Sequence, residues 1–159
     1  MSHEKPVVVV GYDGSPASRA AVVQAVHRAG PSGCVYVVHA YRVPADYWGT
    51  GYYQEALDQV ARQGRELMER LPHEIEVLAD VEWYPEIVGA LPAKAIADIA
   101  ATREADEIIV GSRGYGRARA LLGSVSHELI HLAHCPVTVI PERAVQDIPV
   151  AAEAEAAAI

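Results

Sequence analysis

Glycine and arginine residues gather in one short segment of the sequence, directly after a run of β-branched residues. Ile108, Ile109 and Val110 are typical of a strand buried on both faces, and Gly111 ends the run. The following residues include glycines at 114, 116 and 123 and arginines at 113, 117 and 119, with no acidic residue among them. Ser124 then begins an expected helix. The pattern predicts a locally cationic loop between a strand and a helix.

Such a loop is suited to bind an anion such as phosphate. Glycine lets a phosphate approach the backbone and permits the positive φ angles that turn successive N–H groups inward. The N-terminus of the next helix adds free N–H groups and contributes about 0.3–1 kcal/mol, so several N–H groups and an arginine must converge for useful affinity. The hydroxyls of Ser124 and Ser126 are further donors. The alternative is a surface loop whose glycines only let the chain turn.

The sequence GSRGYGRARALLGSVS, followed by a helix and by CPVTVI, resembles the signature of the universal stress protein family. The nucleotide-binding branch of that family carries Gly, two residues, Gly, nine residues, and then Gly-Ser or Gly-Thr. Gly111, Gly114, Gly123 and Ser124 match these positions. Only eight residues separate Gly114 from Gly123, a departure that concerns the phosphate end of the site. The resemblance extends from about residue 6 to residue 141.

The resemblance implies a homodimer that binds ATP or AMP. In the family, the residue matching Asp13 contacts the nucleotide, the backbone near Ala40 meets the adenine, and Val110 lies beside the sugar. The implied nucleotide-binding residues are Tyr12, Asp13, Ala40, Val110, Gly111, Arg113, Gly114, Gly123, Ser124, Val125 and Ser126. From chemistry alone, Asp13 either accepts ribose hydroxyls and helps to hold Mg²⁺ beside phosphates, or caps a turn before Gly14.

Alternating apolar runs and helical patterns predict an open, doubly wound α/β fold with five parallel strands and about four helices. Ser15 and Pro16 are expected to begin the first helix, as N-cap and first helical residue. The resemblance implies the strand order 3-2-1-4-5, with dimerisation through the fifth strand at Val137, Thr138, Val139 and Ile140. Expected strands cover residues 7–10, 35–40, 75–84, 108–110 and 136–140, and expected helices cover about 16–29, 57–71, 91–103 and the segment from 124.

Two further segments have alternative interpretations. Residues 43–53 are rich in aromatic side chains and are interpreted as packing at a helix or subunit contact, rather than as a flap over a ligand. Residues 1–141 are expected to form one domain, followed by an Ala- and Glu-rich tail, 142–159, that is disordered or a frayed helix, with a docking helix as the alternative.

The sequence His127-Glu128-Leu129-Ile130-His131 matches the H-E-x-x-H pattern of zinc hydrolases. The metzincin extension requires Gly at position 134 and His at 137, where this chain has His134 and Val137. No second helix offers an evident third ligand. We therefore rank a zinc hydrolase below nucleotide binding, and we expect no metal held by the protein alone, apart from Mg²⁺ near Asp13 with the nucleotide.

Composition limits the remaining functions. The only lysines are Lys5 and Lys94, so there is no Walker-type Gly-Lys-Ser or Gly-Lys-Thr motif, and we expect no enzyme activity beyond slow ATP hydrolysis. The net charge of −8 disfavours nucleic acid and acidic membranes as partners. Two distant cysteines and the absence of a long apolar run indicate a cytoplasmic protein. The remaining alternative function is a stress or scaffold protein whose shortened loop has lost nucleotide binding.

Overall fold

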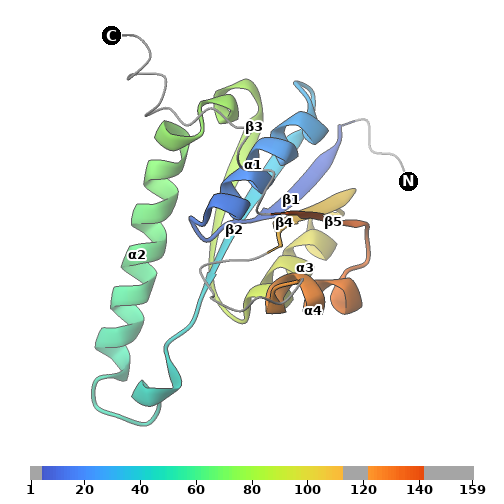
Figure 1. Ribbon diagram of the computed structural model, residues 1–159. Coiled ribbons are helices and arrows are strands. Elements are labelled where there is room, and N and C mark those ends of the chain that lie inside the picture. The colour runs from blue at the N-terminus through green and yellow to red at the C-terminus, as the bar shows by residue number, and fades with distance from the viewer. Residues whose placement is uncertain (1–4, 113–121, 142–159) are drawn as a thin grey trace.

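The computed structural model describes residues 5–112 and 122–141, which contain a five-stranded parallel sheet (Figure 1). The order of the strands is β3-β2-β1-β4-β5, which confirms the predicted order. The strands are β1 (Val7–Gly11), β2 (Cys34–Tyr41), β3 (Glu82–Gly89), β4 (Glu107–Gly111) and β5 (Val137–Ile140). Strand order reverses between β1 and β4, and ligands of such sheets bind outside the carboxyl ends of the strands at this point.

Four α-helices connect the strands and cover both faces of the sheet. They are α1 (Pro16–Ala29), α2 (Tyr53–Glu74), α3 (Pro92–Thr102) and α4 (Ser124–Leu132). Helices α1 and α2 contribute to one buried apolar cluster, and α3 and α4 to the other, so the molecule has three layers (Figure 1). None of the described helices combines the length and the apolar character that crossing a membrane requires.

The central strands are apolar on both faces because helices cover both sides of the sheet. Val8 and Val10 of β1 belong to the cluster beneath α1 and α2, whereas Val9 faces α3. All three side chains are at most 2% exposed. Continuous β-branched runs are typical of buried parallel strands, which is why β1 and β4 were located correctly from the sequence.

The expected strand at residues 75–84 is wrong in its position. Helix α2 continues to Glu74, a 3₁₀ helix (Glu76–Asp80) follows, and β3 begins only at Glu82. The buried residues of this segment are Ile75, Leu78 and Val81, spaced by three, which is the period of a 3₁₀ helix. The alternation of apolar and polar residues concealed this period.

Pro85 does not end the third strand as expected, but lies inside it, opposite Val37 of β2. Strand β3 pairs only with β2 and is therefore an edge of the sheet. A proline is tolerated there because the edge strand leaves half of its backbone groups outside the ladder. The edge position agrees with the strand order 3-2-1-4-5 that the resemblance implied.

Two aromatic side chains of the segment after β2 are exposed, so they do not pack against the helices that the structure describes, as we had expected. Trp48 is 62% exposed and Tyr52 is 69% exposed, and a short 3₁₀ helix (Ala45–Tyr47) precedes them. The indole N–H of Trp48 donates to the carbonyl of Val43, which orders the turn without burying the ring. A subunit contact through these aromatic residues stays a prediction. The tail, residues 142–159, lies outside the described residues.

Candidate functional site

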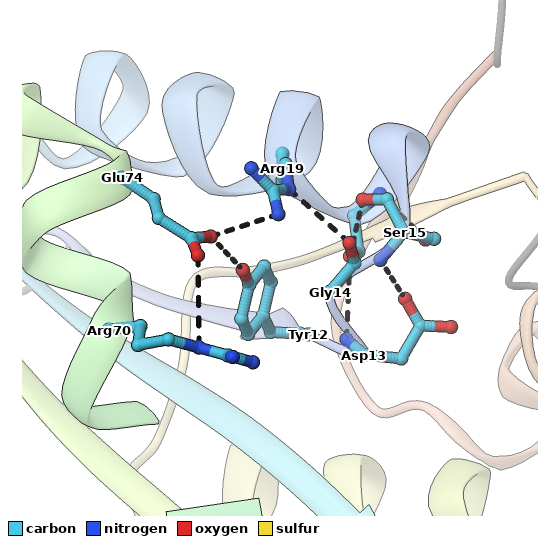
Figure 2. A network of polar contacts seen from close by, with 8 residues as sticks. Tyr12, Asp13, Gly14, Ser15, Arg19, Arg70 and Glu74 are labelled. Carbon is cyan, nitrogen blue, oxygen red and sulfur yellow. Dashed lines mark hydrogen bonds and ion pairs between the residues drawn. The ribbon is translucent and has the colours of Figure 1, made fainter. Parts of the chain in front are cut away.

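The chain turns sharply from β1 into α1 at the carboxyl edge of the sheet. The Asp13 carboxylate accepts a hydrogen bond from the N–H of Ser15 at 2.9 Å, and Gly14 has the positive φ angle of 82° that glycine permits. Ser15 is the N-cap of α1 and accepts from the N–H of Ser18 at 3.3 Å, as predicted. One carboxylate oxygen of Asp13 therefore caps the turn, and its contact with a nucleotide stays a prediction. Its second carboxylate oxygen points away from the turn (Figure 2).

Two glycines let the ends of β1 and β4 approach their covering helices closely. A Cβ on Gly111 would lie 2.8 Å from the Cβ of Ala17 in α1, and a Cβ on Gly11 would lie 2.8 Å from Cδ1 of Ile96 in α3. Real Cβ atoms are essentially never this close to another heavy atom. The end of β4 therefore packs directly against the N-terminus of α1, and the end of β1 packs directly against α3.

Hydrogen bonds connect the end of β4 to the start of α4 across residues 113–121. The carbonyl of Ser112 accepts from the N–H of Gly123 at 2.6 Å and from Oγ of Ser126 at 3.5 Å. The hydroxyl of Ser126 also donates to the carbonyl of Gly123 at 3.0 Å. These bonds place the first turn of α4 beside the end of β4.

The N-terminus of α4 is suited to an anion. Its N-cap, Gly123, has no side chain that could accept from the first-turn N–H groups. The first backbone hydrogen bond of the helix runs from the N–H of His127 to the carbonyl of Gly123. The N–H groups of Ser124, Val125 and Ser126 come before that bond, at the positive end of the helix dipole.

These elements enclose a cavity of about 420 Å³ at the reversal of strand order. This volume lies within the range of about 300–1,000 Å³ that is typical of small-molecule sites. The cavity is lined by Gly11, Tyr12, Asp13, Ser15, Ser18, Val38, Ala40, Pro92, Ile96, Val110, Gly111, Ser112, Leu122, Gly123, Ser124, Val125 and Ser126. Every sequence-predicted site residue that the structure describes is therefore among its walls. Arg113 and Gly114 lie outside the described residues.

The cavity has both polar and apolar walls. The buried polar residues of the described chain are Ser15, Ser18, Ser112 and Ser126, and all four line this cavity. Val38 and Ile96 form an apolar wall beside Val110. The cavity therefore combines apolar side chains from β2, β4 and α3 with helix N-termini and hydroxyl groups.

Several lining residues were missed by the sequence analysis. Val38 follows from strand alternation, because it lies two residues before Ala40 and so shares its face of the sheet. Ile96 lies within the expected helix 91–103, where no motif marked it as a lining residue. No sequence signal marked Pro92, which reaches the cavity from the start of α3. Ser15 and Ser18 were not predicted as lining residues, because both belong to the first turn of α1 and its cap.

A second cavity of about 420 Å³ adjoins the first and shares Asp13 and Ala40 with it. Its other walls come from the end of β2 and from α2, and include Arg42 and Arg70. His39 of β2 also lines it, and Nδ1 of His39 donates to the carbonyl of Tyr12 at 2.9 Å. The turn that carries Asp13 is thus held from the side of β2 as well.

The HELIH sequence lies away from this cavity. The rings of His127 and His131 are both exposed and meet edge to face, with their centroids 5.4 Å apart. Among the described residues, no three His, Cys, Asp or Glu side chains form a group that could hold a metal ion. The two histidines therefore have no third protein ligand within this part of the chain.

Comparisons with known proteins agree with the fold. A model described as the universal stress protein family matches residues 6–141. A universal stress protein of Thermus aquaticus is 34% identical over 136 residues, which cover 84% of this chain and 96% of the relative. Universal stress protein UspA from Lactobacillus plantarum superposes with a TM-score of 0.73 at 24% identity, covering 87% of this chain and 99% of that chain.

Two similar solved structures contain a nucleotide. A universal stress protein in complex with cAMP has a TM-score of 0.58 and 25% identity, covering 87% of this chain and 98% of that chain. The universal stress protein from Archaeoglobus fulgidus in complex with dAMP has a TM-score of 0.53 and 22% identity, covering 86% of this chain and 97% of that chain. The family match over residues 6–141 is the decisive finding. This chain belongs to the universal stress protein family.

Proposed function

We propose that the cavity between β1, β2 and β4 binds an adenine nucleotide, and that its occupancy regulates a response to stress. The observation that carries this proposal is the position of the four buried serines. They gather at one cavity, where the N-termini of α1 and α4 meet an apolar wall. A nucleotide likewise combines an apolar base with an anionic phosphate.

The cavity has residues suited to each part of a nucleotide. The base fits beside Ala40 and the apolar side chains of Val38 and Ile96. The outward carboxylate oxygen of Asp13 is an acceptor for ribose hydroxyls. The N–H groups at the start of α4 are donors for a phosphate, next to the hydroxyl of Ser124.

The nucleotide complexes of related proteins support an adenine base with at least one phosphate. Both cAMP and dAMP, found in two universal stress proteins of the same fold, carry these groups. We propose ATP or AMP as the nucleotide of this chain. With ATP, Mg²⁺ fits beside Asp13, because Mg²⁺ is commonly held by one or two carboxylates together with substrate phosphates.

We propose binding without efficient turnover. The hydroxyls of Ser18 and Ser126 donate to backbone carbonyls, and a carboxylate oxygen of Asp13 accepts from the backbone of Ser15. These groups are therefore engaged in shaping the cavity rather than in activating a nucleophile. Two free cysteines, Cys34 and Cys135, suit the reducing cytoplasm. We further propose a homodimer that pairs through the edge of β5.

Thermal unfolding with added nucleotide tests the proposal. A ligand at 100 times its dissociation constant stabilises a protein by about 2.7 kcal/mol, which raises the melting temperature of a chain of this size by roughly 5–11 °C. We expect such a rise with AMP or ATP and a smaller rise with GMP. Inorganic phosphate alone is expected to have little effect, because it leaves the apolar wall uncovered.

A matched pair of variants locates the binding. Ala40→Leu adds a larger side chain to the cavity and should abolish the nucleotide-dependent rise. Ala79→Leu makes the same change at an exposed position of the 3₁₀ helix after α2 and should keep it. If no adenine nucleotide at millimolar concentration raises the melting temperature of the natural chain, the alternative of a non-nucleotide stress protein is correct.

A further inference from the structure

Glu74, the last residue of α2, is the centre of a polar network that reaches the β1–α1 turn (Figure 2). Its Oε2 atom lies 2.9 Å from Nη2 of Arg19 in α1 and accepts from the hydroxyl of Tyr12 at 3.4 Å. Its Oε1 atom lies 3.9 Å from Nε of Arg70, one helical turn earlier. Glu74 thus joins the end of α2 to the β1–α1 turn and to α1.

The location of this carboxylate is unfavourable for α2 considered alone. The C-terminus of a helix carries a partial negative charge, so an acidic residue there is repelled by the helix dipole. Two guanidinium groups and a phenol hydroxyl surround Glu74 and offset this repulsion. The network is therefore better explained by a role in positioning the β1–α1 turn than by a role in stabilising α2.

Arg19 transmits this contact to the turn that carries Asp13. While Nη2 of Arg19 meets Glu74, its Nε donates to the carbonyl of Gly14 at 3.3 Å. Figure 2 shows the guanidinium of Arg19 between Glu74 and the Gly14 turn. The planar fork of an arginine can hold two partners at fixed relative positions, which a lysine ammonium cannot do.

Tyr12 makes a second connection between Glu74 and the cavity. The Tyr12 side chain is 3% exposed and lines the cavity, and its hydroxyl donates to Glu74. The backbone of Tyr12 is held on both sides, because its N–H donates to the carbonyl of Val38 and its carbonyl accepts from His39. The hydroxyl therefore gives Tyr12 a polar contact with the end of α2, in addition to the packing of its side chain in the apolar cluster beneath α1 and α2.

We propose that Glu74 is a positioning residue of the nucleotide site, which acts through Arg19 and Gly14 to fix the carboxylate of Asp13 toward the ribose. The inference rests on the proposed function of the cavity. Glu74 itself does not line the cavity, so its effect on a nucleotide must pass through the turn. The N–H of Ser15 donates to Asp13, so the amide resonance of Ser15 is sensitive to the conformation of that turn even without a ligand.

Calorimetric titration of AMP into Glu74→Gln measures the effect. This substitution removes the charge at constant size, and we expect it to weaken AMP binding about 2-fold to 10-fold. Arg19→Lys keeps a cation for Glu74 but loses the fork, and should weaken AMP binding as well. The amide resonance of Ser15 should shift in both variants, with or without AMP.

Glu86→Gln is the matched control. Glu86 lies 2.8 Å from Nη2 of Arg103, its side chain is 27% exposed like that of Glu74, and neither partner lines the cavity. Glu86→Gln should lose a similar amount of thermal stability while binding AMP as the natural chain does. A purely structural role for Glu74 would make the two variants equivalent.

A double variant tests the route through Asp13. In the Asp13→Asn background, Glu74→Gln should weaken AMP binding no further. The inference would be overturned if the two substitutions weakened AMP binding additively. It would also be overturned if the natural chain bound AMP and Glu74→Gln bound it equally well. If the natural chain does not bind AMP, the proposed function fails. The link between Glu74 and the turn is tested separately, because an unshifted Ser15 amide resonance in Glu74→Gln would overturn it.

Discussion

Gly111 of β4 and Ala17 of α1 are in such close contact that a Cβ at position 111 would lie 2.8 Å from the Cβ of Ala17. It would also lie 2.9 Å from the carbonyl carbon of Ala17 and 3.0 Å from the N atom of Ser18, which are backbone atoms. Backbone within a helix cannot rotate aside as a side chain can. The end of β4 is therefore fixed against the N-terminus of α1, where the cavity lies.

Gly111→Ala should consequently destabilise the protein. Overpacking of a tight contact costs about 1–3 kcal/mol, and this cost should appear as a lower urea midpoint with an unchanged slope. Gly51→Ala is the control, because a Cβ at Gly51 would meet no atom within 4 Å. An unaltered midpoint in Gly111→Ala would show that β4 and α1 are further apart than described.

The buried hydroxyl of Ser126 should stabilise the junction between β4 and α4. It donates to the carbonyls of Gly123 and Ser112, so Ser126→Ala should lower the free energy of unfolding by about 0.5–1.5 kcal/mol. Ser124→Ala, at an exposed position of the same helix turn, should change the free energy of unfolding by less than about 0.5 kcal/mol. Equal effects of the two substitutions in urea titrations would contradict the role given to Ser126.

The sequence analysis correctly located the elements whose residue pattern fits only one type of secondary structure. The runs around Val9 and Ile109 are β-branched and end at glycines, so only a buried strand fits them. The segment from Ile75 to Val81 satisfies both a period of two and a period of three. Packing beneath α1 and α2, which a single sequence does not contain, selected the second period.

The site was predictable where a motif or a strand end marked it. Asp13, Ala40 and Gly123 follow directly from these signals, and the structure brings them to one cavity. Ile96 and Glu74 carry no such signal, because they reach the region through the packing of α3 and α2 against the sheet. Such contacts depend on tertiary structure and not on spacing along the chain.

The two thiols should be weakly reactive in the folded protein. Burial raises the pKa of Cys34 and Cys135 above the ordinary value, with nearby carboxylates adding to the effect, so the reactive thiolate is scarce at pH 8. Mass spectrometry should detect slower alkylation by iodoacetamide in buffer than in urea. Equal rates in the two solutions would show that the thiols are not shielded.

The same shifts give a pH dependence with a defined sign. Above about pH 8.5, the unfolded chain releases thiol protons that the folded chain still holds, so the unfolded state binds fewer protons. The free energy of unfolding should therefore fall as the pH rises from that value. Replacing both cysteines by alanine should make this part of the profile flatter, and an unchanged profile would assign the fall to other groups.

The edge of β5 supports a prediction about self-association. The carbonyl of Pro136 accepts from Ile108 of β4, and that of Ile140 accepts from Ser112, directly after β4. The alternate residues, Val137 and Val139, therefore direct their backbone groups to the free side of the strand. Pairing of two copies along this edge would use the N–H of Val139. The natural chain should then elute with the mass of a dimer in size-exclusion chromatography with light scattering.

Val139→Pro removes this outward N–H without taking a donor from the bonds to β4, and should shift the protein to the monomer. Val139→Thr keeps the N–H and a β-branched side chain of similar size, and should remain dimeric. Both variants should melt cooperatively, which separates lost pairing from unfolding. A dimer that persists in Val139→Pro would place the interface elsewhere, and the exposed rings of Trp48 and Tyr52 are then the next surface to alter.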